Sequence, residues 1–428
     1  MNPIPRRADD AHVVTLANAV RVVVMPLPHL ETASVSVFVR TGSSHESRRQ
    51  NGISHVVEHM AFKGTRTRTC QQINLQAERL GADVNAHTDK DHTAYHMRGR
   101  ARDAAAFVRM LGDIVQASTF PEAELDRERQ VLLQEFIEDE EEPISTAYKL
   151  FDKLCFGSHP LAQPVIGSRA NIRRLDRDEL LAYVQQQYSG ANVVVGIAGH
   201  VDVDAVVRDA EATFRSMRAG LPNLVDAPAQ GGGIASRALT GSAQTHLVFG
   251  LPLPTLLDEA HHAGVVAAAL FGEGMSSPLL DEIRERRGLA YYLSCSADIG
   301  ELAGQFVVEA STAPEHADEF LAELKRLLEA QAGHVDPVGL ERAKNQIAVR
   351  RLRAWERPAR RLEDAALDLL ALGRVRSRDE MAERIEAVDA AQVRDAFTQM
   401  LLRPEAIAIA GRIRKGSVER AREIFALR

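Results

Sequence analysis

Two similar segments half a chain length apart constrain the fold of this sequence most strongly. Residues 192–200 (Asn-Val-Val-Val-Gly-Ile-Ala-Gly-His) predict a buried strand that ends in a glycine turn and is followed by a helix over 202–214. Residues 405–412 (Glu-Ala-Ile-Ala-Ile-Ala-Gly-Arg) predict the same strand and turn, again followed by a helix. Gly199 and Gly411 are 212 residues apart in a chain of 428. This spacing indicates an internal duplication.

The duplication predicts two homologous domains joined by a linker. Residues 220–233 contain two prolines and end in three consecutive glycines, a composition that is typical of a connecting segment. We therefore predict an N-terminal domain over 1–219, a linker over 220–235 and a C-terminal domain over 236–428.

The order of elements within each half indicates the fold class. Early strand patterns, such as residues 20–25 and 33–39, suggest hairpin pairing, and long helical patterns follow them. This order predicts an α+β fold, with helices packed on one face of a mostly antiparallel sheet.

Residues 55–59 (His-Val-Val-Glu-His) are the strongest candidate for a metal site. In a helix, His55 and His59 lie one turn apart on one face, where two imidazoles can bind one ion. Glu58 borders the same face, where a carboxylate can contact a metal-bound water without being a ligand. The order is the reverse of the common H-E-x-x-H zinc proteases. The alternative is an amphipathic helix that carries two histidines by chance.

A catalytic zinc site usually has three protein ligands, so a third is expected on another element. Residues 120–136 predict a helix, for which Ser118 or Thr119 offers a cap. Glu128 and Glu135 are two turns apart and share a face that also carries apolar residues. Buried carboxylates need partners, and a metal for one and a supporting hydrogen bond for the other would supply them. A solvated acidic helix is the alternative.

These motifs resemble those of the pitrilysin-like M16 metallopeptidases, which include the β subunit of mitochondrial processing peptidase. The family pattern is H-x-x-E-H, a ligand glutamate about 75 residues later, and another glutamate seven residues before that ligand. Here 75 residues separate His59 from Glu135, and Glu128 is in the earlier place. The resemblance implies that His55, His59 and Glu135 bind one Zn²⁺ per chain. It also implies that Glu58 is the general base and that Glu128 supports a ligand.

The resemblance covers essentially the whole chain and implies two α/β-roll halves that face each other as a clamshell. The second half has lost the metal ligands, since residues 264–271 contain none, and we expect His261 and His262 to be surface residues. Arg284 and Tyr291 match a pair with which active members hold the substrate and stabilise the oxyanion. The alternative is a helix end at which Arg284 pairs with a nearby carboxylate and Tyr291 packs.

Residues 81–95 match a third family region, an edge strand that pairs with the substrate backbone. The resemblance assigns this contact to Asn85 and Ala86, and it places Phe62 on the floor of the cleft.

Three histidines in and beside this strand are further candidate ligands. Strand alternation places His87 on the opposite face from His92 and His96. Because the implied ligand set is already complete, we predict that none of the three binds metal.

The function that the resemblance implies is a zinc-dependent endopeptidase that hydrolyses peptides or small unfolded proteins, with Glu58 activating a zinc-bound water. The alternative is a catalytically silent or half-site subunit that needs a homologous partner. Short members of the family pair as homodimers or heterodimers. A partner could then supply the residues that correspond to Arg284 and Tyr291.

Composition excludes several other classes. The net charge of −7 is spread along the chain and gives no basis for nucleic-acid binding. The three cysteines are isolated, which argues against a disulfide framework. The sequence contains no run of 18 consecutive apolar residues, so we predict no membrane span. Residues 1–10 lack the apolar core of a signal peptide, so we expect a cytoplasmic protein, or a periplasmic one if the chain is a processed mature form.

Overall fold

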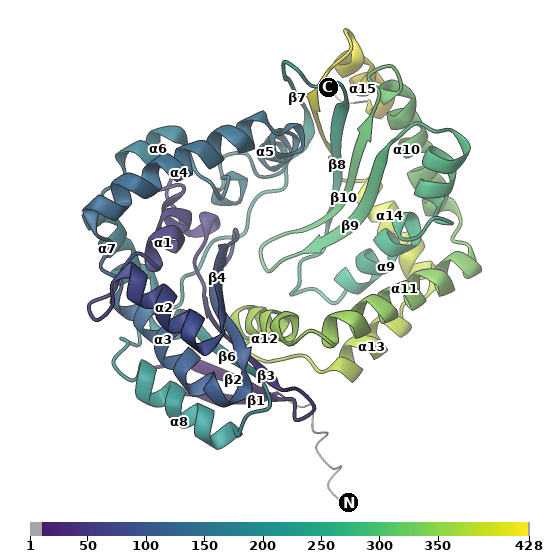
Figure 1. Cartoon of the computed structure of the whole chain (residues 1–428). Helices are drawn as coiled ribbons and strands as arrows, with labels where there is room; N and C mark the ends of the chain where they lie inside the picture. The colour runs from purple at the N-terminus through teal and green to yellow at the C-terminus, as the bar shows by residue number, and fades with distance from the viewer. Residues whose placement is uncertain (1–10, 427–428) are drawn as a thin grey trace, which may run out of the picture. The chain divides into compact units, whose positions relative to one another are not determined.

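The computed structural model describes residues 11–426, so the expectation about a signal peptide in residues 1–10 lies outside the described residues. The chain forms two compact units, each built around its own sheet (Figure 1). Unit 1 comprises Met1–Phe136, Gln163–Val225 and Arg353–Ser377, and unit 2 comprises Ile137–Ala162, Asp226–Leu352 and Arg378–Arg428.

Unit 1 contains a six-stranded sheet with the order β1-β2-β6-β3-β5-β4. Its strands are β1 (His12–Thr15), β2 (Arg21–Pro26), β3 (Thr32–Val39), β4 (Asp83–Thr88), β5 (Thr93–Arg100) and β6 (Val193–Gly199). Only β2 and β6 pair in parallel, and all other neighbours in this sheet are antiparallel. The two middle strands β3 and β6 are rich in β-branched residues and buried, as strands covered on both faces are expected to be.

Unit 2 contains a five-stranded sheet with the order β7-β11-β8-β10-β9. Its strands are β7 (Gly233–Ala238), β8 (Thr245–Leu253), β9 (Tyr292–Ile299), β10 (Gly304–Thr312) and β11 (Ala406–Gly411). Again one pair, β7 and β11, is parallel. The order repeats that of unit 1 without β1, and β11 takes the place of β6. The predicted α+β class with two homologous halves is therefore confirmed.

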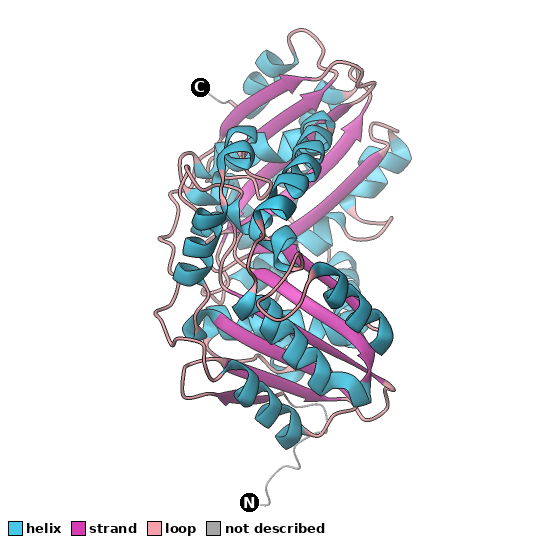
Figure 2. Ribbon diagram, turned by 60° about the vertical axis from the view of Figure 1, so that its left-hand side comes forward, coloured by secondary structure: helices cyan, strands magenta, loops and turns pink. Residues whose placement is uncertain are grey.

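Helices cover the sheets, as Figure 2 shows for both units. Unit 1 contains α1 (Ile53–Ala61), α2 (Cys70–Leu80), α3 (Ala104–Ala117), α6 (Arg169–Arg174), α7 (Arg177–Gln187), α8 (Val203–Phe214) and α12 (Pro358–Leu372). Unit 2 contains α5 (Pro143–Phe156), α9 (His261–Gly272), α10 (Ala317–Gly333), α13 (Arg378–Glu386), α14 (Ala390–Leu401) and α15 (Ser417–Phe425). Helices α4 (Glu122–Glu141) and α11 (Pro337–Trp355) each carry the chain across a unit boundary. Short 3-10 turns are η1 (Ser43–His45), η2 (Ala101–Asp103), η3 (Pro160–Ala162) and η4 (Gly190–Asn192).

Each sheet is covered on one face by a helix from the other half of the sequence. Helix α12 packs on the first sheet, where Leu362 lies over Gly196: a Cβ on that glycine would come within 3.2 Å of the leucine side chain. Helix α5 packs on the second sheet in the same way, with Phe151 over Gly250, where a Cβ would come within 2.4 Å of the ring. The compact units thus differ from the predicted continuous domains by an exchange of two segments.

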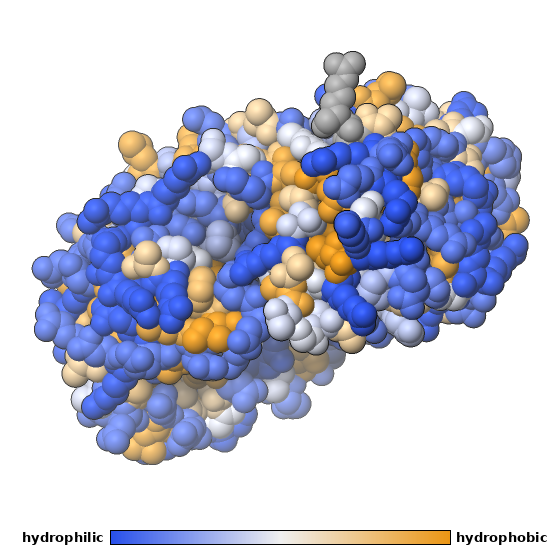
Figure 3. Space-filling view, turned by 90° about the horizontal axis from the view of Figure 1, so that it is seen from above, coloured by the Kyte–Doolittle hydropathy of each residue, from blue (hydrophilic) through white to orange (hydrophobic). Residues whose placement is uncertain are grey.

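No helix within residues 11–426 is both long and apolar enough to cross a membrane. Hydrophilic residues cover most of the face drawn in Figure 3, and hydrophobic residues gather there only in small groups.

Candidate active site

The predicted H-x-x-E-H segment forms α1, and a buried carboxylate holds the start of this helix. Glu46, only 2% exposed, accepts hydrogen bonds from the Gly52 N–H (2.7 Å) and the Ser54 N–H (2.8 Å). It thereby satisfies N–H groups that a helix leaves free at its first turn. Gly52 has φ of +98°, and a Cβ there would lie 2.9 Å from the Cα of Gly167. Only glycine fits this position. The Glu46 carboxylate and the backbone at Gly167 thus both fix the start of α1.

The three predicted ligands converge in unit 1. Glu135 Oε2 lies 3.8 Å from His55 Nε2 and 3.5 Å from His59 Nε2, and one donor atom from each residue lies within 4.8 Å of the other two. Donors about 2.0–2.1 Å from a tetrahedral zinc are about 3.3 Å apart, so these side chains fit the ion with small adjustments. Burial, with a smaller contribution from His59, lowers the pKa of His55 to about 4. The imidazole is then neutral at pH 7, as a metal ligand must be.

Glu128 contacts His59 on the side away from the ligand atoms. Its Oε2 lies 3.2 Å from His59 Nδ1, and its Oε1 pairs with Lys63 Nζ at 2.6 Å. A carboxylate at the second ring nitrogen fixes the tautomer and the orientation of an imidazole. The seven-residue spacing along α4 therefore places Glu135 beside the Nε2 atoms of both histidines and Glu128 beside the Nδ1 atom of His59.

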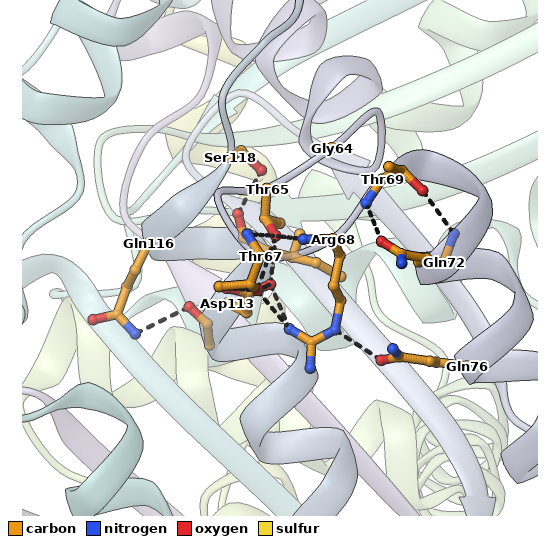
Figure 4. A network of polar contacts seen from close by, with 12 residues as sticks. Gly64, Thr65, Thr67, Arg68, Thr69, Gln72, Gln76, Asp113, Gln116 and Ser118 are labelled. Carbon is orange, nitrogen blue, oxygen red and sulfur yellow. Dashed lines mark hydrogen bonds and ion pairs between the residues drawn. The ribbon is translucent and has the colours of Figure 1, made fainter.

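A polar network links the segment after α1 to α2 and to the end of α3 (Figure 4). Immediately after α1, the Gly64 carbonyl accepts a hydrogen bond from the Thr119 N–H at 3.0 Å, and Ser118 Oγ donates to the Ala61 carbonyl at 2.7 Å. Thr65 Oγ1 donates to Asp113 Oδ2 at 2.7 Å. The prediction that Ser118 or Thr119 caps α4 is wrong, because α4 begins at Glu122 and Pro121 directly precedes it. The two hydroxyls instead donate to the carbonyls of Ile114 and Gly64.

Glu58 faces the edge strand of the sheet. The Thr88 hydroxyl, at the end of β4, donates to Glu58 Oε2 at 3.0 Å. Burial raises the pKa of Glu58, against smaller opposing effects of this hydrogen bond and of His59. A carboxylate with a raised pKa is a stronger base, which suits proton transfer near neutral pH.

The strand predicted to bind substrate is the edge strand β4, which within the described part of the chain pairs only with β5. Asn85 is exposed on it and Ala86 is partly exposed. Phe62 follows α1 directly and packs against Tyr95, with the ring centroids 6.1 Å apart. Its ring is partly buried against the core of unit 1.

The prediction that His87 lies on the opposite face from His96 is wrong. In the hairpin of β4 and β5, Asn85 pairs with His96, so His87, two residues further along β4, shares their face. The rings of His87 and His96 are 5.8 Å apart. Alternation counted along the sequence failed because a turn between the strands reverses the chain. The turn also brings His92 Nε2 to 3.3 Å from His87 Nε2.

Arg284 and Tyr291 lie in unit 2, in and just after the π-helix η5 (Leu280–Arg286). The Tyr291 side chain is 69% exposed, so it does not pack as the structural alternative required. Arg284 is exposed as well, and Glu285 lies 3.8 Å from its guanidinium. π-helical turns are rare and are frequent at functional sites. The Tyr291 side chain is therefore available to a ligand, whereas Arg284 has the carboxylate neighbour that the structural alternative expected.

Helix α9 takes the place in unit 2 that α1 has in unit 1. His261 and His262, predicted to be surface residues, are 5% and 8% exposed, so that prediction is wrong. The first turn of α9 is buried with the rest of this apolar helix. Within residues 11–426, both groups of side chains that fit a metal ion lie in unit 1.

Comparison with known proteins decides the family. The family model described as Insulinase (Peptidase family M16) matches residues 21–169, and that of the Peptidase M16 inactive domain matches residues 174–347. A protein of Rickettsia bellii named as an uncharacterized zinc protease is 31% identical over 386 residues, which cover 90% of this chain and 93% of the relative. The chain belongs to peptidase family M16.

A second relative of this M16 chain agrees, and a solved structure shares its fold. A protein of Bacillus subtilis, also named as an uncharacterized zinc protease, is 30% identical over 406 residues, covering 92% of this chain and 97% of its own. The crystal structure of a protease from Helicobacter pylori matches with a TM-score of 0.86 at 20% identity, covering 94% of this chain and 100% of that one. The family predicted from the motifs is confirmed.

Two features of the site were missed by the sequence analysis. Glu46 lies outside any periodic pattern, and its role depends on a loop that folds back onto α1. The network around Thr65 and Asp113 joins three segments whose separate patterns give no signal of contact.

Proposed function

We propose that this M16 chain is a zinc-dependent endopeptidase that hydrolyses peptides or small unfolded proteins. The observation that carries the proposal is the convergence of Glu135 of α4 with His55 and His59 of α1, the helix that also holds Glu58, with donor atoms within 4.8 Å of one another. We assign these three residues as ligands of one Zn²⁺. Bound there, zinc supplies a Lewis acid that lowers the pKa of a coordinated water.

Glu58 is proposed as the general base. Its carboxylate accepts a proton from the attacking water and later returns it to the leaving amine. The hydrogen bond from Thr88 holds one carboxylate oxygen and leaves the other for this exchange. Glu128 keeps the His59 ring in the orientation that directs its Nε2 toward Glu135.

Substrate binding is proposed for the free edge of β4 and for the exposed pair in unit 2. The backbone at Asn85 and Ala86 can add an extended peptide to the sheet. We propose that Phe62 contacts a substrate side chain. Arg284 and Tyr291 donate hydrogen bonds to substrate carbonyl oxygens, and the phenol stabilises the developing oxyanion.

Replacement of Tyr291 with Phe tests the oxyanion role. We expect kcat to fall about 10²-fold, because one preorganised donor is lost. The control is Tyr292→Phe, which removes a hydroxyl from a neighbouring tyrosine that is 50% exposed and should leave kcat unchanged. Steady-state kinetics on a fluorogenic peptide measures both. Equal kcat values for Tyr291→Phe and the unaltered chain would remove Tyr291 from the mechanism.

Metal dependence of the purified chain tests the proposed activity itself. We expect the chain alone to cleave peptides, to lose activity with a chelator, and to regain it with added Zn²⁺. A chain that is inactive alone but active with a homologous M16 subunit would instead be the half-site member of a heterodimer. A chain inactive under both conditions would contradict the peptidase assignment.

A further inference from the structure

A second group of side chains in unit 1 has the composition of a metal site. His87, Asp89, His92 and Glu363 each place one donor atom within 4.8 Å of the donors of the other three. His87 belongs to β4, Asp89 and His92 to the turn that follows, and Glu363 to α12. The group thus joins a hairpin near the active site to the helix that comes from the other half of the sequence.

The spacing of these donors matches that of the proposed catalytic ligands. The Nε2 atoms of His87 and His92 are 3.3 Å apart, which is about the distance between two donors on one tetrahedral zinc. Asp89 Oδ2 lies 3.8 Å from His92 Nε2, and Glu363 Oε1 lies 3.9 Å from His87 Nε2. The ligand pairs of the catalytic group are separated by 3.5 and 3.8 Å.

His92 is already oriented as a ligand. It is 2% exposed, and its Nδ1 lies 2.7 Å from Asp91 Oδ1. A carboxylate at Nδ1 holds the tautomer whose Nε2 carries the lone pair, the arrangement found at histidine ligands of metals. His87, Asp89 and Glu363 are partly or fully exposed, so an ion can reach the group from solvent. Glu363 Oε2 pairs with Arg360 at 3.2 Å, while Oε1 is the oxygen nearer His87.

Against the prediction from the sequence that His87 and His92 bind no metal, we propose that His87, Asp89, His92 and Glu363 form a second metal site, distinct from the catalytic group, that binds a divalent transition-metal ion. Two imidazoles with two carboxylates suit Zn²⁺ better than Mg²⁺ or Ca²⁺, which prefer oxygen ligands alone. The ion links the β4–β5 hairpin to α12. Thr88, which donates to Glu58, lies between two residues of this site. The ion therefore fixes β4, the strand from which Thr88 donates a hydrogen bond to the proposed base Glu58 of α1.

Metal content of the full chain tests this site without using activity. After equilibration with excess Zn²⁺ and gel filtration, we expect two ions per unaltered chain by mass spectrometry. The double variant His87→Gln/Glu363→Gln should hold one, and the double variant His55→Ala/Glu135→Ala should also hold one. The matched control His96→Gln/Asp364→Asn alters an imidazole of the same hairpin and the next carboxylate of α12, and should keep both ions.

A thermal shift provides the second measurement. In the His55→Ala/Glu135→Ala background, added Zn²⁺ should raise the melting temperature, because an ion that binds only the folded chain stabilises it. Adding His87→Gln/Glu363→Gln should abolish that shift, and circular dichroism checks that each variant is folded. One ion in the unaltered chain at saturating Zn²⁺, or two in folded His87→Gln/Glu363→Gln, would overturn the proposal. The catalytic assignment would survive either result.

Discussion

Replacement of Glu58 with Gln is expected to lower kcat on a peptide substrate by about 10²–10⁴-fold, the usual contribution of a positioned general base. Glutamine keeps the shape of the side chain and can still accept the hydrogen bond from Thr88. It cannot take a proton from water at neutral pH. Zinc content should be unchanged, because Glu58 is not among the three residues whose donors converge.

A surface glutamate provides the matched control for this change. Glu78 is exposed on α2, and Glu78→Gln should retain the turnover of the unaltered chain. Turnover retained in Glu58→Gln would show that another group removes the proton. Loss of zinc together with turnover would show that the substitution disturbs the ligands, and it would leave the base to be identified by other means.

Replacement of Glu135 with Ala is expected to remove one zinc ion per chain and with it essentially all peptide turnover. Its Oε2 lies 3.8 Å from His55 Nε2 and 3.5 Å from His59 Nε2, so its loss leaves two ligands where catalytic zinc usually has three. Metal analysis after dialysis against a weak chelator measures the first effect. Glu138→Ala, three residues further along α4 and exposed, is the matched control.

A graded result is expected at the neighbouring carboxylate. Because Glu128 contacts His59 through the nitrogen that is not directed at Glu135, Glu128→Gln should weaken zinc affinity by about 10–100-fold and not abolish binding. If Glu135→Ala kept the zinc content of the unaltered chain while Glu128→Gln lost it, the two roles would have to be exchanged.

The sequence predicted the parts of the site that depend on local periodicity. His55 and His59 are one helical turn apart, and Glu128 and Glu135 are two turns apart, so a single correct assignment of each helix places them. The two similar segments 192–200 and 405–412 also predicted the duplication, and they form the equivalent strands β6 and β11 of the two sheets. In each case the signal is a spacing within one element or a repeat between two of them.

The remaining features depend on contacts between distant segments. Glu46 serves α1 only because the intervening loop turns back, and His87 meets His92 only because a turn reverses the strand. The exchange of α5 and α12 leaves no trace in hydrophobic pattern, because an apolar helix face looks the same whichever sheet it covers. The hydrophobic pattern of a helix specifies which of its faces is buried, but it does not specify which sheet that face covers.

The exchange of α5 and α12 bears on how such a chain could arise. A half-length ancestor with one sheet and one such helix would have an apolar sheet face that its own helix did not cover. Two copies could cover both faces by trading helices, as a domain-swapped dimer does. Gene fusion would then join two protomers that were already mutually dependent. The two halves of the chain, repeated at an interval of 212 residues, would then correspond to the two protomers of an obligate dimer joined in one polypeptide.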